Sequence, residues 1–484
     1  MNSQIRKLGV VMIVLFSALF FQLNYLQVID AKTLNNHPAN SRAVVRDFSQ
    51  PRGVIQTADG TVIAQSIPSN DAFKFQRQYP LGPLFAHVTG YFSFTYGSEG
   101  VEKEYNDALT GKVKKSSFNP RDLLVEKDKT ATVTLTLRRD LQQIATEQLG
   151  DRKGAVVALD PRTGAILALA DYPTYDPSSL ASHSQDPVRQ AWTDLNADAD
   201  KPLLPRSYRE RYPPGSSFKV VTAATALATG TATLTQPVYP NLTELPLPNS
   251  GGQTLANFGG GTCGGPLPEA LRVSCNTAFA QLGMDLGADK LSGGANDFGF
   301  NKVPPIDLPY GAAAHFPSAS DFAHDQPGLA KSAIGQQDVA ATPLQMALVA
   351  AGIANNGVIM TPHVMAEIRD TEGEVLQRYE NKPWMTAVPP NVANQTRDMM
   401  VGVVNGGSGT RAQIPGVTVA GKTGTAQTGL GKSHTWFISF APAEAPRVAV
   451  AVMLENQPSS NEFTGGALAA PIAQAMMQAA LSSR

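Results

Sequence analysis

The chain has 484 residues, of which 42% are hydrophobic and 16% charged, and its formal net charge at pH 7 is −1. This length and composition predict a globular α/β protein of two or three domains, and the near-zero charge gives no electrostatic basis for binding nucleic acid. The two cysteines exclude a disulfide-dense scaffold and a multi-cysteine metal cluster. No His-Glu-x-x-His metal motif occurs. We expect neither a metal nor a cofactor.

The N-terminus predicts a membrane anchor over residues 1–30. No charge occurs between Lys7 and Asp30, and residues 8–29 read LGVVMIVLFSALFFQLNYLQVI, a run long enough to cross a hydrocarbon core of about 30 Å. Basic residues precede the run, so the positive-inside rule puts the N-terminus in the cytoplasm and the remaining chain outside the cell membrane. A cleaved signal peptide is the alternative, but no clear A-x-A cleavage site follows.

Residues 31–130 predict a small N-terminal domain. Short apolar runs flank an Asp59-Gly60 turn, which indicates a hairpin, and the stretch from Glu99 to Leu109 predicts a short helix. No residues in this region suggest chemistry, so we interpret it as a pedestal or interaction module.

Residues 131–484 predict the main domain. Alternating apolar runs indicate strands at 132–136, 155–159, 165–169, 417–425, 435–440 and 448–454. Helical patterns lie between the two groups of strands, and a last helix follows Pro471. The first and last strands must therefore meet in an antiparallel sheet with a helical insertion, which makes the fold α/β (α+β).

A serine and a lysine one helical turn apart predict a nucleophile with its base. Pro213-Pro214-Gly215 breaks the chain before a helix-compatible run, so Ser216 lies at a helix start and Lys219 lies three positions on, on the same face. A serine needs a base, and a lysine serves when burial or a second cation lowers its pKa. Ser-x-x-Lys alone is a weak signal, but this is the single copy in the sequence.

A second element is Lys422-Thr423-Gly424-Thr425, the single Lys-Thr-Gly in the sequence, which follows an alternating run. A lysine and hydroxyls on a strand suit a carboxylate, and we expect Gly424, which lacks a Cβ, to let a substrate backbone approach closely. A solvated strand end is the alternative interpretation.

Ser-x-Asn, the third element, occurs three times, at Ser117, Ser274 and Ser459. The Ser274-Cys275-Asn276 copy alone lies between the other two motifs, and it precedes a predicted helix. We therefore expect Ser274 to relay a proton and Asn276 to bind a substrate amide. The other two copies are interpreted as polar loop groups.

Ser-x-x-Lys, Ser-x-Asn and Lys-Thr-Gly in this order resemble the shared signature of penicillin-binding proteins and serine β-lactamases. The segment from Pro213 to Lys219 is similar to the nucleophile segment of class B penicillin-binding proteins. Further segments are similar to that class, at 51–53, 97–109, 154–177, 342–345 and 354–357. The short length and small pedestal most resemble the penicillin-binding protein A branch of actinobacteria. Two departures are the cysteine within Ser-x-Asn and the lack of a PASTA-like repeat.

This resemblance implies a serine D,D-transpeptidase of peptidoglycan synthesis, with a pedestal over 31–130 and a penicillin-binding domain over 131–484. Ser216 would attack the D-Ala-D-Ala carbonyl, Lys219 would take its proton, and Ser274 would relay a proton to the leaving D-Ala. Asn276 would bind the stem-peptide amide. Lys422, Thr423 and Thr425 would hold the terminal carboxylate, and the backbone N–H groups of Ser216 and Thr425 would form the oxyanion hole.

The expected partners are peptidoglycan stem peptides, β-lactams, the membrane, and a glycosyltransferase or division-complex proteins. The rival functions are a β-lactamase, a D,D-carboxypeptidase, and a non-enzymatic β-lactam sensor or septal scaffold. No deacylating carboxylate is identifiable, which disfavours a β-lactamase, and a sensor would carry several membrane spans.

Cys263 and Cys275 predict a disulfide, because they lie in an oxidising compartment and the chain has no other cysteine. Two buried thiols are the alternative. We expect the bridge to brace the Ser-x-Asn segment from the side facing away from the cleft.

Overall fold

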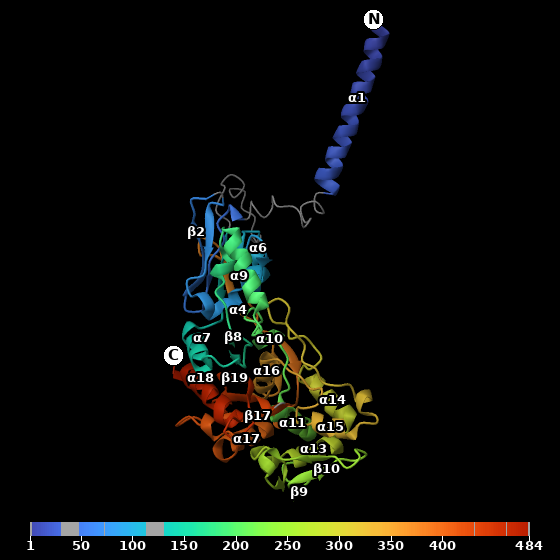
Figure 1. Ribbon diagram of the computed structural model, residues 1–484, viewed down its shortest axis with the longest axis vertical. Coiled ribbons are helices and arrows are strands. Elements are labelled where there is room, and N and C mark those ends of the chain that lie inside the picture. Colours follow the sequence, from blue (N-terminus) through green and yellow to red (C-terminus); the bar gives the residue numbers. More distant parts are fainter. Residues whose placement is uncertain are drawn as a thin grey trace. The chain divides into compact units, whose positions relative to one another are not determined.

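The computed structural model describes residues 2–30, 48–71, 73–112, 130–429, 431–460 and 462–482. The N-terminal helix α1 (Asn2–Asn24) continues through a π-helical turn, Tyr25–Ile29 (Figure 1). Within it, Ser3–Val28 is long and apolar enough to cross a membrane, as the sequence predicts. The other described residues form two larger sheets, four two-stranded sheets and a helical region.

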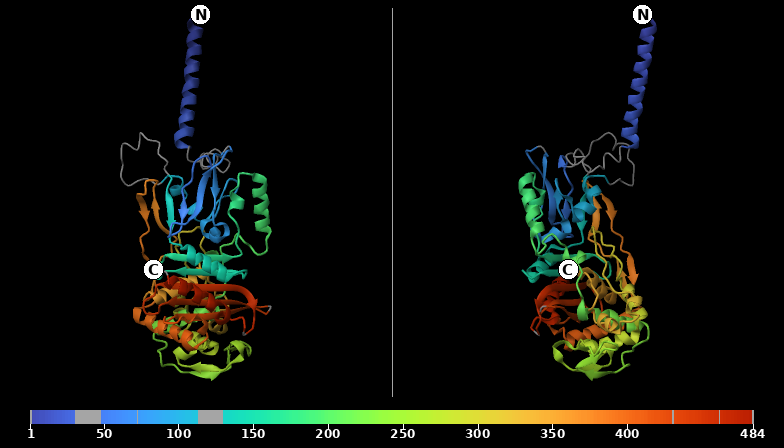
Figure 2. Two further views of the ribbon diagram at one scale, coloured as in Figure 1. Left: turned by 90° about the vertical axis from the view of Figure 1, so that its left-hand side faces the viewer. Right: turned by 45° about the vertical axis from the view of Figure 1, so that its right-hand side comes forward.

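The larger antiparallel sheet has the order β17-β18-β19-β7-β8. Its strands come from both ends of the main domain: β7 (Gly154–Leu159), β8 (Ile166–Tyr172), β17 (Ala420–Gly429), β18 (Lys432–Ala441) and β19 (Val448–Pro458). The predicted meeting of first and last strands is confirmed, since Val157 of β7 pairs with Ala451 of β19. In Figure 2 the red C-terminal strands accordingly lie beside the cyan hairpin.

Both faces of this sheet are covered, because alternate side chains enter two apolar clusters. Val157 and Ala451 belong to the cluster that contains α16 (Pro343–Ala354). Val156 and Val450 belong to the cluster built with two further helices, α7 (Arg139–Leu149) and α18 (Ala470–Ser482). The strands therefore form a rigid central layer on which site residues can be positioned.

The strand predicted at 417–425 begins later than expected. Ile414 and Val417 pair across a tight turn in which Gly416 adopts φ 75°, and β17 starts at Ala420. Val417 and Val419 alternate because their side chains pack near the sheet, but they are not part of strand β17.

Helices fill the insertion between the two groups of strands. They include α11 (Lys219–Ala228), α12 (Leu267–Arg272), α13 (Asn276–Leu286), α14 (Ala288–Asp297), α15 (Gln326–Ser332) and α17 (Pro390–Gly406). Two-stranded sheets lie beside them: β9 (Tyr239–Leu242) with β12 (Cys263–Gly265), and β10 (Glu244–Pro246) with β11 (Thr254–Ala256).

The second sheet has the order β15-β14-β6-β1-β2-β3. It contains the predicted hairpin of β1 (Ile55–Gln56) and β2 (Val62–Pro68), together with β3 (Phe75–Gln78), β6 (Thr132–Leu135), β14 (Met365–Arg369) and β15 (Val375–Arg378). In Figure 2 the orange strands β14 and β15 accordingly lie beside the cyan strand β6, which pairs in turn with the blue strand β1. A division of the chain at residue 130 therefore separates strands of one sheet. The predicted helix from Glu99 to Leu109 is broken at Tyr105 into α5 (Gly100–Glu104) and α6 (Asn106–Leu109).

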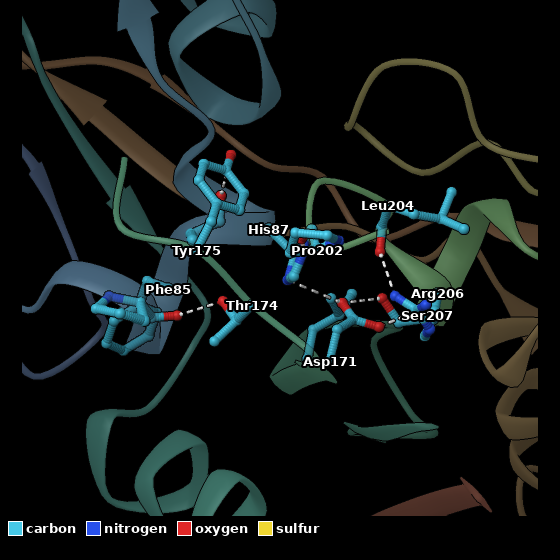
Figure 3. Close-up of polar contacts among 12 residues, drawn as sticks. Phe85, His87, Asp171, Thr174, Tyr175, Pro202, Leu204, Arg206 and Ser207 are labelled. Atoms are coloured by element: carbon cyan, nitrogen blue, oxygen red, sulfur yellow. Dashed lines mark hydrogen bonds and ion pairs between the residues drawn. The ribbon is translucent and has the colours of Figure 1, made fainter. Parts of the chain in front are cut away.

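A buried polar network holds the short helix α10 (Arg206–Arg209) that leads to the nucleophile segment (Figure 3). The carboxylate of Asp171, on β8, accepts hydrogen bonds from the backbone N–H of Ser207 at 2.6 Å and from its hydroxyl at 2.8 Å. His87 faces the same carboxylate, with Nδ1 at 3.7 Å. Burial raises the pKa of Asp171 and lowers that of His87.

Side chains of α10 and of the residues just after it bind β19. The Arg206 guanidinium donates to Oε1 of Glu455 at 2.8 Å, and the Tyr212 hydroxyl donates to the same oxygen at 2.5 Å. The segment that follows Tyr212 therefore enters the site from a fixed point on the sheet.

Candidate active site

The nucleophile segment is a 3-10 turn, Gly215–Phe218, directly before α11. Gly215 adopts φ 53°, and a Cβ there would lie 2.9 Å from the Thr425 carbonyl oxygen of β17. On its other side the Gly215 N–H donates to the Gly335 carbonyl at 2.9 Å. Gly215 of the Pro-Pro-Gly sequence therefore packs closely between β17 and the Gly335 turn. Ser216 lines the cavity described below.

Lys219 is fully buried in the first turn of α11. Its ammonium group donates to the Ser274 carbonyl at 2.8 Å and to Oδ1 of Asn276 at 2.7 Å. Burial, and secondly the charge of Lys422, lower its pKa well below the ordinary value. A neutral amine one helical turn from Ser216 is suited to accept a proton.

Ser274 lies between the two lysines. It adopts φ 61°, an uncommon conformation for a residue other than glycine, directly before α13. The helix start is held by Asn257, whose Oδ1 accepts hydrogen bonds from the N–H groups of Asn276 at 2.9 Å and Thr277 at 3.0 Å. Asn257 was not predicted, because a side chain that caps a helix from a distant loop leaves no local pattern.

The ammonium group of Lys422 donates to the Ser274 hydroxyl at 2.8 Å and to the Thr423 carbonyl at 3.0 Å. Burial lowers the pKa of Lys422 to about 7. Beside it, the Thr423 and Ser408 hydroxyls lie 2.7 Å apart. The three predicted motifs thus converge, and Ser408 joins them as a further hydroxyl.

Gly424 does not line the cavity, contrary to the expectation that it lets a substrate backbone approach. The cavity is lined by Thr423, Thr425 and Gln427, which are alternate positions on β17. A Cβ on Gly424 would instead meet the Pro214 carbonyl oxygen at 2.7 Å and the Ser217 nitrogen at 3.1 Å. The glycine admits the nucleophile segment, not a substrate backbone.

The Sγ atoms of Cys263 and Cys275 lie at bonding distance, 2.16 Å, and their Cα atoms are 5.8 Å apart. Cys275 is buried, whereas Cys263 lines the cavity. The expectation that this pair lies on the side facing away from the cleft is therefore wrong. The pair ties the Ser-x-Asn segment to the loop that forms one wall of the cleft.

The cavity has a volume of about 700 Å³. It is lined by residues of all three motifs, by the 254–263 loop, and by Val273, Lys331, Ile334, Gln336, Ser408, Ser459, Ser460, Thr464 and Gly466. Among these described lining residues there is no Asp or Glu, and Lys331 is the one charged side chain.

The cavity also changes the interpretation of one rejected motif copy. Ser459 and Ser460, which were interpreted as polar loop groups, line the cavity, so the third Ser-x-Asn copy lies at the site. The Ser117 copy lies outside the described residues.

This arrangement of a serine, two buried lysines and a second serine beside a five-stranded sheet defines a penicillin-binding, serine acyl-transfer fold. The chain matches the family described as penicillin binding protein transpeptidase domain over residues 154–478, and the penicillin binding protein A dimerisation domain over residues 52–133. The chain therefore belongs to the penicillin-binding protein transpeptidase family and is a class B member.

Among its relatives is the peptidoglycan D,D-transpeptidase PbpA of Mycobacterium tuberculosis, 39% identical over 99% of both chains. The peptidoglycan D,D-transpeptidase MrdA of Acinetobacter baumannii is 30% identical over 78% of this chain and 63% of its own length. The solved structure of M. tuberculosis penicillin-binding protein A as a ceftriaxone acyl-enzyme complex superposes with a TM-score of 0.83 at 38% identity, covering 90% of this chain and 100% of that one. The predicted family and fold are thus confirmed.

Proposed function

We propose that the protein is a serine D,D-transpeptidase that cross-links peptidoglycan stem peptides through an acyl-enzyme on Ser216. The observation that carries this proposal is the hydrogen-bonded series of Lys219, Ser274 and Lys422 beside a serine that lines the cavity. Relatives named as peptidoglycan D,D-transpeptidases support the same substrate class.

In the first half-reaction Ser216 Oγ attacks the carbonyl carbon of the penultimate D-Ala. Neutral Lys219 accepts the hydroxyl proton, and the new C–O bond forms as the carbonyl becomes an oxyanion held by the N–H groups of Ser216 and Thr425. The peptide C–N bond then breaks, and Ser274 passes a proton to the leaving D-Ala nitrogen. Asn276 binds the stem-peptide amide beside this centre.

Lys422, Thr423 and Thr425 hold the terminal carboxylate of D-Ala-D-Ala, and Ser408 adds a hydroxyl next to Thr423. The same carboxylate position occurs in β-lactams, which therefore acylate the same serine. The acyl-enzyme structures of M. tuberculosis penicillin-binding protein A with ceftriaxone and penicillin G support this assignment.

In the second half-reaction the amine of a neighbouring stem peptide attacks the ester carbonyl and the C–N bond forms. The Ser216 C–O bond breaks, and the proton lost by the amine returns to Ser216 Oγ through Lys219. Hydrolysis would require an activated water. Because the described cavity lining contains no carboxylate to activate one, we infer that the acyl-enzyme waits for an amine, which distinguishes the protein from a β-lactamase.

The test uses a thioester donor with and without a D-amino acid acceptor. We expect acceptor-dependent product to exceed hydrolysed acid when acceptor is abundant. If the product is mainly the acid, the transpeptidase assignment fails and a D,D-carboxypeptidase replaces it. A scaffold or sensor would be acylated by penicillin yet turn over no donor.

We further propose a single-pass membrane protein with a cytoplasmic N-terminus and membrane anchor over 1–30 and a pedestal over 31–130 whose sheet is completed by β6, β14 and β15. The rest of residues 131–484 forms the proposed extracytoplasmic catalytic domain. Ser3–Val28 supports the anchor, and it is the one candidate span in the described part of the chain, which disfavours a multi-span sensor. A glycosyltransferase or division-complex proteins remain the proposed protein partners in cell wall synthesis.

A further inference from the structure

Lys331 is the one charged side chain among the described residues that line the cavity. It lies near the end of α15 and is half-buried. Among the described residues, no hydrogen bond or ion pair involves the Lys331 ammonium group. A cation that contacts a substrate cavity and has no protein partner there is available to a ligand anion.

Lys331 and the proposed carboxylate clamp are separated by the nucleophile segment. Backbone bonds from Ile334 and Gln336 to the Lys331 carbonyl form the turn that contains Gly335, and Gly335 accepts from Gly215. The opposite side of Gly215 faces Thr425 of β17. Because Lys331 adjoins the Gly335 turn and not β17, we assign it a ligand anion other than the terminal carboxylate.

The same cavity has an apolar edge. Phe258 and Val273 line it and remain 40% and 37% exposed, respectively. Exposed apolar side chains in a substrate cleft suit a methylene chain. Lys331 suits a ligand carboxylate, and the apolar edge suits an aliphatic chain of the same ligand.

We propose that Lys331 selects stem peptides whose diamino acid carries a free carboxylate, a diaminodicarboxylic acid, over stem peptides that carry lysine at that position. This inference rests on the proposed transpeptidase function. The carboxylate is attracted to the Lys331 ammonium group, whereas a lysine side chain brings a like charge and no carboxylate. The carboxylate can belong to the donor or to the acceptor peptide, and the experiment separates the two.

The experiment measures kcat/KM for transpeptidation by the full-length protein in detergent. Three peptides are compared that differ only in the diamino acid: the dicarboxylic form, its monoamide, and lysine. One series varies the donor with a fixed acceptor, and the other varies the acceptor with a fixed donor. We expect the free carboxylate to be favoured by about 5- to 10-fold over the amide in one series, the size of a partly exposed charge-assisted contact.

Lys331→Gln should abolish this preference, Lys331→Arg should keep it, and Lys331→Glu should reverse it toward the lysine peptide. Lys302→Gln, which removes the same charge at an exposed position outside the cavity lining, is the matched control and should leave the preference intact. The acylation rate with penicillin, measured for each Lys331 variant, shows whether its nucleophile remains reactive, and Lys302→Gln should match the parent protein.

Equal kcat/KM for all three peptides in both series, or a preference that survives in Lys331→Gln, overturns the inference. Absence of acceptor-dependent product from every donor, despite acylation by penicillin, contradicts the proposed function instead. The two failures are therefore distinguishable.

Discussion

The ammonium group of Lys422 donates to the Ser274 hydroxyl at 2.8 Å, although 148 positions separate these residues in the chain. The Ser274 carbonyl accepts in turn from Lys219 at 2.8 Å. Two buried lysines that contact the same serine are disfavoured as two cations, since like charges repel. The charge of Lys422 therefore adds to the effect of burial in lowering the pKa of Lys219. The arrangement favours a neutral base beside a cation.

Ser216→Ala should abolish covalent labelling by penicillin. Ser216 carries the hydroxyl at the start of α11 that faces the cavity, and alanine removes the oxygen without changing the backbone. Intact-protein mass spectrometry should show one adduct for the parent protein and none for the variant. Ser217→Ala is the control, because that hydroxyl is buried and donates to the Pro214 carbonyl. An adduct that persists in Ser216→Ala would remove Ser216 from its role.

Acylation should show a bell-shaped dependence on pH. The rate constant rises as Lys219, whose pKa is lowered by burial, loses its proton and becomes a base. It falls as the pH passes the Lys422 pKa of about 7, because the cation that holds the carboxylate is then lost. Stopped-flow acylation from pH 5 to 9 measures both limbs. Lys422→Arg should lose the falling limb, since arginine stays protonated, and a falling limb that remains would contradict the assignment.

Lys422→Ala should slow acylation by about 10- to 100-fold, the effect of losing a charge-assisted contact of about 1.5–3 kcal/mol. The fold should persist, because removal of a buried cation leaves no unpaired charge. Acylation kinetics and thermal unfolding should be measured together. An unchanged acylation rate would assign the carboxylate contact to other groups.

Gly424→Ala should impair acylation through the nucleophile segment. The added Cβ would meet the Pro214 carbonyl oxygen at 2.7 Å and the Ser217 nitrogen at 3.1 Å, so the turn that carries Ser216 must shift. We expect acylation to fall about 10-fold or more, with about 1–3 kcal/mol lost from the free energy of unfolding. Gly293→Ala in α14 is the matched control, since its Cβ would meet nothing within 4 Å. Normal acylation by Gly424→Ala would show that the turn tolerates the displacement.

Cys263 and Cys275 should be bridged in exported protein. Thiol counting under denaturing, non-reducing conditions should find no free thiol, and reduction should release two. The twelve-position separation predicts that Cys263→Ser lowers the free energy of unfolding by up to about 3 kcal/mol. Two free thiols before reduction would end the prediction.

Local patterns predicted much of the fold. The hairpin of β7 and β8 follows from period-two alternation around a turn, and the membrane helix follows from an uncharged apolar run. The order of the three motifs identified the family. Each of these signals is carried by neighbouring residues, so the sequence contains them without knowledge of the fold.

Contacts between residues far apart in the chain could not be predicted from local patterns. The pedestal sheet includes β14 and β15, from residues 365–378, because strand pairing joins segments whose partners no local pattern names. Among the three Ser-x-Asn copies, two contribute to the cavity for different reasons: Ser274 bonds the two lysines, and Ser459 follows β19.

Residue type and spacing were sufficient to predict Ser216 as the nucleophile, Lys219 as its base and Lys422 as the strand lysine, because these signals are local in the sequence. Which face of β17 lines the cavity follows only from the folded structure. Strand alternation permits either face, and the packing of Gly424 against Pro214 turns Thr423 and Thr425 toward the cavity. The same long-range packing puts Asn257 on the start of α13 and Lys331 in the cavity wall, since side chains from separate loops meet only when the chain folds.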